Sequence, residues 1–238
     1  MLSIWYIWYI RTREQIEQPI QAVLLDLDGT IANSIELGLE AHNKFAEFTA
    51  RPYVPIKVHP LDIAQLESFR TLGYTKALRK LDINILELLA IRFLTNTHMR
   101  SIAREIPAYD GVPELLGKLS ALNHIKTGVV SSGDPQYVAA FLDEQGIHGL
   151  DIAQGGAGLL FKARAIAAAL DKISVLPSQG IYVGDEPRDV RAARKLGMIP
   201  IGVSWGVAGR EGFDHHPPDH LVDTVEELET TIGRYVQF

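Results

Sequence analysis

Residues 22–30, with the sequence AVLLDLDGT, constrain the fold of this chain more than any other stretch. Ala22–Leu25 is a short and fully apolar run, which is typical of a strand buried on both faces of a parallel sheet. The run ends in two aspartates, Asp26 and Asp28, after which Gly29 lets the backbone turn sharply. Ligands of an open parallel sheet bind outside the carboxyl ends of its strands, so we expect both acids to lie at a ligand site.

Two acids at the end of a buried strand are costly unless a cation or a proton compensates their charge. We interpret Asp26 and Asp28 as a metal-assisted nucleophile and a general acid/base. A plain Asp-Gly turn is the structural alternative. A calcium-binding loop is excluded, because such a loop needs five or more oxygen ligands and glycine at its sixth position. Here glycine is fourth, and Ile31 and Ala32 follow it.

The composition is that of a globular protein with a sizeable core. Hydrophobic residues make up 47% of the 238 residues and charged residues 22%, which suits one large domain or a core with a smaller insertion. The net charge is −6 and no basic tract is present, so nothing indicates a nucleic-acid partner. The chain has no cysteine, which excludes disulfides and thiolate sites and fits a reducing cytoplasm.

Residues 1–20 are expected to be a peripheral N-terminal extension. Their apolar run, MLSIWYIWYI, is about half as long as a membrane-spanning helix. Positive charges follow the run and no small-residue cleavage site is evident, which argues against a signal peptide. We expect no membrane association; an edge strand, an interfacial anchor and a translated upstream stretch all remain open interpretations.

Residues 35–106 are predicted to form an inserted all-helical cap. Ser34 is placed to cap a helix over Ile35–Thr49, and a loop with three prolines follows at 51–60. Further helices are predicted over 61–72, 75–81 and 83–106. The apolar positions of the first helix are Leu37, Leu39, Phe45 and Phe48. About seventy residues of helix are too many for one crossover between strands.

Residues 21–34 and 107–238 are predicted to form the core domain. Later strands are expected over 125–131, 150–154, 180–183, 199–203 and 220–222. Helices are expected over 109–122, 135–145, 161–170, 189–196 and 225–232. This alternation predicts an α/β fold with a Rossmann-like, doubly wound parallel sheet.

Four strand ends or helix starts carry polar groups. They are Asp26 with Asp28, Ser131, Lys162, and Asp185 with Glu186 and Asp189. A parallel sheet brings the carboxyl ends of its strands to one edge, so these residues can meet. Converging carboxylates suit Mg²⁺, and an ammonium group beside a hydroxyl suits a tetrahedral anion. The combination predicts phosphoryl transfer.

Four segments in this order, DLDGT, VVSSG, FKARAI and VGDEPRDVRAARKLG, resemble the motifs of the haloacid dehalogenase-like hydrolase superfamily. Within it the chain is most similar to phosphoglycolate-phosphatase-like members, from about Ala22 to Leu228. The predicted helical insertion matches the position of the small cap in that group. The resemblance implies Mg²⁺-dependent hydrolysis of a small phosphorylated metabolite, with phosphoglycolate as the expected substrate.

The resemblance also implies a role for each matching residue. Asp26 would attack phosphorus and form an aspartyl-phosphate. Asp28 would protonate the departing alkoxide and then deprotonate water. Mg²⁺ would be held by the side chains of Asp26 and Asp185 and by the backbone carbonyl of Asp28. Ser131, with Ser132 beside it, and Lys162 would bind the phosphoryl group.

Two further acids and several alternatives remain. Glu186 and Asp189 are expected to act on the metal through water or hydrogen bonds, although Asp189 also suits a helix N-terminus. Ser131 alternatively caps a helix, and Lys162 alternatively is a solvated lysine at a helix start. The acid at Asp28 disfavours a dehalogenase, since dehalogenases of the family lack it. A phosphomutase or a non-catalytic binding protein on the same scaffold is the alternative function, and the oligomeric state is open.

Overall fold

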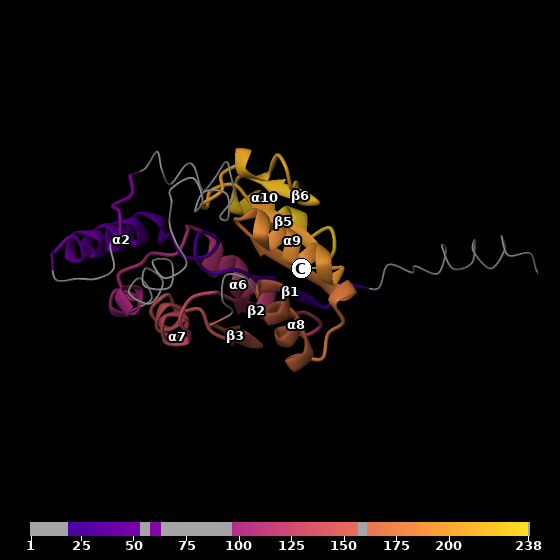
Figure 1. Cartoon of the computed structure of the whole chain (residues 1–238). Coiled ribbons are helices and arrows are strands. Elements are labelled where there is room, and N and C mark those ends of the chain that lie inside the picture. The colour runs from indigo at the N-terminus through magenta and orange to yellow at the C-terminus, as the bar shows by residue number, and fades with distance from the viewer. Residues whose placement is uncertain (1–18, 53–57, 63–96, 157–160, 238) are drawn as a thin grey trace, which may run out of the picture.

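The computed structural model describes residues 19–52, 58–62, 97–156 and 161–237 (Figure 1). Most of the predicted extension at 1–20 and of the predicted cap at 35–106 lies outside these ranges. The predicted domain boundaries therefore stay predictions. Within the described residues, no helix combines the length and the apolar character that a membrane span requires.

The core is a parallel sheet of six strands in the order β3-β2-β1-β4-β5-β6. The strands are β1 (Ala22–Leu25), β2 (Lys126–Val130), β3 (Ile152–Gln154), β4 (Gly180–Gly184), β5 (Ile199–Val203) and β6 (His220–Val222). The chain builds outward from β1 to β3, returns to β4 beside β1, and builds outward again to β6. This is the doubly wound order, so the predicted fold class is confirmed.

Helices cover both faces of the sheet (Figure 1). They are α6 (Val112–Ser120), α7 (Pro135–Glu144), α8 (Lys162–Lys172), α9 (Pro187–Leu196) and α10 (Val225–Ile232), with short 3₁₀ helices η1 (Pro177–Gln179) and η2 (Glu211–Phe213). The helix α2 (Ile35–Thr49) lies to the side of the sheet and covers neither face (Figure 1). Residues of α6, α7 and α10 share one hydrophobic cluster, and residues of α8 and α9 share another.

The strand β1 joins the two clusters because its side chains alternate between them. Val23 and Leu25 belong to the cluster with α6, α7 and α10, whereas Ala22 and Leu24 belong to the cluster with α8 and α9. All four side chains are fully buried. Burying one leucine or valine contributes about 1.5–3 kcal/mol, so β1 is firmly held and fixes the position of the acids that follow it.

The bounds predicted for α2 are confirmed, but its predicted apolar face only in part: Leu37 packs against the cluster with α6, α7 and α10, and Leu39 and Phe45 are partly buried. The buried residues of α2 are Ala41, His42, Ala46 and Thr49, whereas Phe48 is 47% exposed. Polar side chains bind the segment 58–61 here: His42 Nε2 lies 2.9 Å from the carbonyl oxygen of His59, and Thr49 Oγ1 accepts from the backbone N–H of Val58 at 3.0 Å. The spacing of apolar residues in a sequence cannot predict such contacts between polar side chains and a distant backbone.

The helix predicted over 83–106 also ends earlier than expected. Its described part is helical over 97–101 and then turns. Ile106 lies outside the helix and is fully buried in the larger cluster. Pro107 follows it, and the residue before a proline is restricted away from helical geometry.

Candidate active site

The strand register brings the polar residues of β1, β2 and β4 to one edge of the sheet. Leu25 lies opposite Val129 on β2 and Val183 on β4. Asp26 is therefore one residue beyond this level, while Ser131 and Asp185 are two residues beyond it. The edge is the carboxyl end of the sheet at the point where the strand order reverses, which is where open α/β sheets bind ligands.

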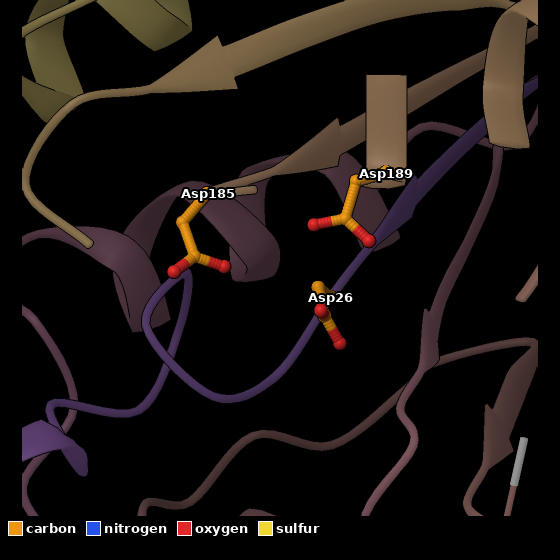
Figure 2. Close-up of side chains that lie close together, drawn as sticks. All are labelled: Asp26, Asp185 and Asp189. Atoms are coloured by element: carbon orange, nitrogen blue, oxygen red, sulfur yellow. The ribbon is translucent and has the colours of Figure 1, made fainter. Parts of the chain in front are cut away.

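Three buried aspartates meet at this edge (Figure 2). Asp26, Asp185 and Asp189 each offer a carboxylate oxygen, and these oxygens all lie within 4.8 Å of one another. The three residues are 2%, 0% and 1% exposed. The structure thus joins Asp26 and Asp185, as expected, and adds the carboxylate of Asp189 to them. So many buried like charges are tolerated only when cations or protons compensate them.

Lys162, the first residue of α8, supplies one positive charge. Its Nζ lies 2.7 Å from Asp26 Oδ2 and 3.2 Å from Asp189 Oδ1, and the side chain is 4% exposed. Burial lowers the pKa of Lys162, but the carboxylates of Asp189 and Asp26 outweigh burial and hold this pKa above its ordinary value. The ammonium group also lies 5.4 Å from the centre of the Tyr182 ring. The alternative of a solvated lysine is therefore wrong.

A second cation, Arg188, lies near the cluster but pairs with Glu186, so the positive charges do not balance the carboxylates. Desolvation, followed by the charges of Glu186, Asp189 and Asp26, raises the pKa of Asp185 well above its ordinary value. Desolvation also raises the pKa of Asp189 to about 6, against the attraction of Lys162. A cluster of hard oxygen donors with a deficit of positive charge fits a divalent cation such as Mg²⁺.

The carboxylates of Asp185 and Asp189 are each oriented by neighbouring groups. Asp185 accepts from Thr30 Oγ1 at 3.2 Å and from the backbone N–H of Val207 at 2.7 Å. Asp189 Oδ2 accepts from the backbone N–H of Glu186 at 3.2 Å, as part of a capping box at the start of α9. Asp189 therefore stabilises the start of α9, as the helix-terminus interpretation expects, and also lies beside Asp26 and Asp185.

Asp28 is not one of the three clustered carboxylates and has different hydrogen-bond partners. Its Oδ1 accepts from Ser34 Oγ at 2.8 Å and from the hydroxyl of Tyr137 at 2.7 Å. Desolvation raises the pKa of Asp28 above its ordinary value, and the two hydroxyl hydrogen bonds oppose that shift. Ser34 occupies the N-cap position of α2, but its side chain makes no cap hydrogen bond. The predicted cap interaction is wrong, because the hydroxyl group binds Asp28 instead.

Ser131 is fully buried at the carboxyl end of β2. Its Oγ accepts from the backbone N–H of Gly133 at 2.9 Å. The cap of α7 is Asp134, which accepts from the backbone N–H groups of Gln136 and Tyr137. The helix-cap alternative for Ser131 is therefore wrong. Ser132 is the next residue and is partly exposed.

Two glycines leave room for the Asp185 side chain. A Cβ at Gly29, whose φ is +78°, would lie 2.2 Å from Asp185 Oδ2. A Cβ at Gly206 would lie 2.2 Å from Asp185 Cβ and 2.4 Å from the carbonyl oxygen of Gly29. Both contacts are far shorter than van der Waals distance. The backbone at Gly29 and at Gly206 therefore packs directly against Asp185, with no room for a side chain at either position.

We expect Gly206→Ala to lower the free energy of unfolding by about 1–3 kcal/mol, since the methyl group forces the backbone at Gly206 away from Asp185. The matched control is Gly117→Ala in α6, where an added Cβ meets nothing within 4 Å. That change should stabilise by about 0.5–1 kcal/mol, because alanine favours the helix. Urea unfolding of both variants checks the prediction, and equal stabilities would contradict it.

Comparison with known proteins agrees with this geometry. The family model for haloacid dehalogenase-like hydrolases matches residues 23–203. Phosphoglycolate phosphatase from Synechococcus elongatus is 30% identical over 212 residues, covering 88% of this chain and 95% of that protein.

Solved structures share the fold. A predicted phosphatase from Clostridium acetobutylicum superposes with a TM-score of 0.74 at 22% identity, over 91% of this chain and 100% of that one. CbbY from Rhodobacter sphaeroides, solved with xylulose-(1,5)bisphosphate, gives a TM-score of 0.66 at 21% identity, over 88% and 96% of the two chains. The family match spans most of the described core, and the predicted resemblance is confirmed: this chain belongs to the haloacid dehalogenase-like hydrolase family.

Proposed function

We propose that this protein is a Mg²⁺-dependent phosphatase that hydrolyses a small phosphorylated metabolite through an aspartyl-phosphate. The observation that carries the proposal is the buried cluster of Asp26, Asp185 and Asp189 with Lys162 in ion-pair contact. Its relative from Synechococcus elongatus is a phosphoglycolate phosphatase. A phosphoglycolate-like ester is therefore the first substrate class to test.

Asp26 is the proposed nucleophile. Its Oδ1 accepts from the backbone N–H of Leu27 at 2.8 Å, and its Oδ2 lies 2.7 Å from Lys162 Nζ. A carboxylate oxygen of Asp26 forms a bond to phosphorus while the bond from phosphorus to the ester oxygen breaks. Water then attacks phosphorus, which returns the carboxylate and releases inorganic phosphate. Covalent catalysis of this kind divides one difficult displacement into two easier ones.

Asp28 is the proposed general acid/base for both steps. It gives a proton to the departing alkoxide in the first step and takes a proton from the attacking water in the second. Its hydrogen bonds to two hydroxyl groups, in place of an ion pair, support this division of roles. Ser131, Ser132 and Lys162 are the proposed ligands of the phosphoryl oxygens.

Asp26 and Asp185 are the proposed side-chain ligands of Mg²⁺, together with the backbone carbonyl of Asp28. The ion would neutralise the charge that gathers on the phosphoryl group and on the carboxylates. Asp189 holds Lys162 in place through the 3.2 Å ion pair and acts on the ion through water. The uncompensated charge of the buried carboxylates supports this assignment.

The test is phosphate release from a panel that holds phosphoglycolate, other small monoesters, a sugar bisphosphate and inorganic pyrophosphate. Each compound is assayed with MgCl₂ and with an excess of chelator. We expect Mg²⁺-dependent release from a small monoester and none with chelator. Absence of release from every compound by folded protein with MgCl₂ would contradict the proposal, and a requirement for a sugar bisphosphate as activator would favour the phosphomutase.

A further inference from the structure

Tyr137 contacts Asp28 although 109 residues separate them in the sequence. Tyr137 lies in the first turn of α7, is 1% exposed, and places its hydroxyl 2.7 Å from Asp28 Oδ1. Its backbone N–H donates to the N-cap residue Asp134 at 3.3 Å, and its ring packs near Phe141. The ring, backbone and hydroxyl are therefore all fixed, so the hydroxyl has one position relative to the acid.

The hydrogen bonds of Asp28 fall on one oxygen. Oδ1 accepts one hydrogen bond from Tyr137 and one from Ser34. Together these two hydrogen bonds use both lone pairs of Oδ1. Among the described residues, Oδ2 has no hydrogen-bond partner. Burial raises the pKa of Tyr137 far above its ordinary value, so this residue remains a donor at any working pH.

We propose that Tyr137 is a positioning residue that holds the carboxyl group of Asp28 by Oδ1 and so leaves Oδ2 as the oxygen that faces the reaction. The inference rests on the proposed phosphatase function. The Oδ2–H bond breaks as the proton passes to the departing ester oxygen, and it forms again when water gives up a proton during the second step. Without Tyr137, the carboxyl group turns more freely about its terminal torsion, so Oδ2 is held less firmly in place for the reaction.

The test is Tyr137→Phe, which keeps the ring and removes only the hydroxyl group. We expect kcat for the most active ester to fall about 10- to 100-fold, a part of the 10²- to 10⁴-fold that general acid–base catalysis contributes. KM should change by less than about two-fold, because the phosphoryl ligands are untouched. Circular dichroism and urea unfolding report whether the fold is retained.

The matched control is Tyr235→Phe. This change removes a partly buried hydroxyl contact of similar length, 2.6 Å to His220 Nε2. His220 is the first residue of β6, so the contact lies away from the carboxyl edge of the sheet. Its kcat and KM should equal those of the wild type. An equal loss of kcat in both variants would mean that the loss is structural, which overturns the inference.

A double-mutant cycle separates action through Asp28 from any other effect of Tyr137. In an Asp28→Asn background, Tyr137→Phe should leave the residual rate unchanged within about two-fold. An unchanged kcat in the single variant, or the same further loss in both backgrounds, would overturn the inference. Failure of the proposed function is distinct, because the wild-type protein itself would then release no phosphate.

Discussion

Asp26→Asn is expected to lower the rate of phosphate release by at least about 1,000-fold, the scale of losses seen when a covalent nucleophile is removed. The amide group cannot form the acyl-phosphate, so neither step of the reaction is available. The assay is phosphate release from the best ester of the panel, at saturating substrate and Mg²⁺. A variant with a rate near that of the wild type would refute the assignment of the nucleophile.

The fold should survive this change. Asparagine keeps the oxygen that accepts from the backbone N–H of Leu27, and Lys162 keeps its contact with Asp189. The change also removes one of three mutually repelling carboxylates. The control is Asp171→Asn at the exposed end of α8, which should retain the wild-type rate. Unfolding by urea and circular dichroism distinguish loss of chemistry from loss of structure.

Asp28→Asn is expected to lower kcat by about 10²- to 10⁴-fold, the usual contribution of a general acid or base. The amide group has no proton to give to an alkoxide and cannot take one from water. Both steps therefore slow with an alkyl phosphate. With p-nitrophenyl phosphate the leaving group departs without a proton, so only the second step should slow.

Rapid-mixing measurements with p-nitrophenyl phosphate test this prediction. The variant should release one equivalent of p-nitrophenolate per protein in a fast phase, followed by slow turnover as the phosphorylated protein accumulates. Mass spectrometry should find the added phosphate on the peptide that contains Asp26. Kinetics equal to those of the wild type would show that another group handles the proton.

The sequence predicts much of the sheet and of the acid cluster because both depend on short patterns. The bounds of β1, β5, β6 and α10 match the expected ranges, since apolar runs bordered by glycine, proline or polar residues mark them locally. The meeting of Asp26 with Asp185 follows from parallel topology alone. The roles of these residues in catalysis and metal binding stay predictions, which the experiments above address.

Contacts between side chains on distant segments are what the sequence does not reveal. Tyr137 has the spacing of an ordinary buried aromatic residue on a helix, and no local signal marks its hydroxyl as a partner of Asp28. Ser34 is placed at the correct helix start, yet its hydroxyl group turns toward Asp28. The buried face of α2 is missed in part for the same reason, because His42 and Thr49 are held by backbone groups of residues beyond the helix.

The way the loops surround Asp185 has a consequence for the order in which the protein is made. Thr30 contacts Asp185 across 155 residues, and Trp205 Nε1 donates to the carbonyl oxygen of Thr30 across 175 residues. β1 also pairs with β4, which is synthesised much later. Contacts of such long sequence separation close slowly during folding. A nascent chain that has emerged only as far as β3 therefore holds the first acids without their partners. The site can be assembled only after β4 and the loop that holds Trp205 and Val207 have left the ribosome.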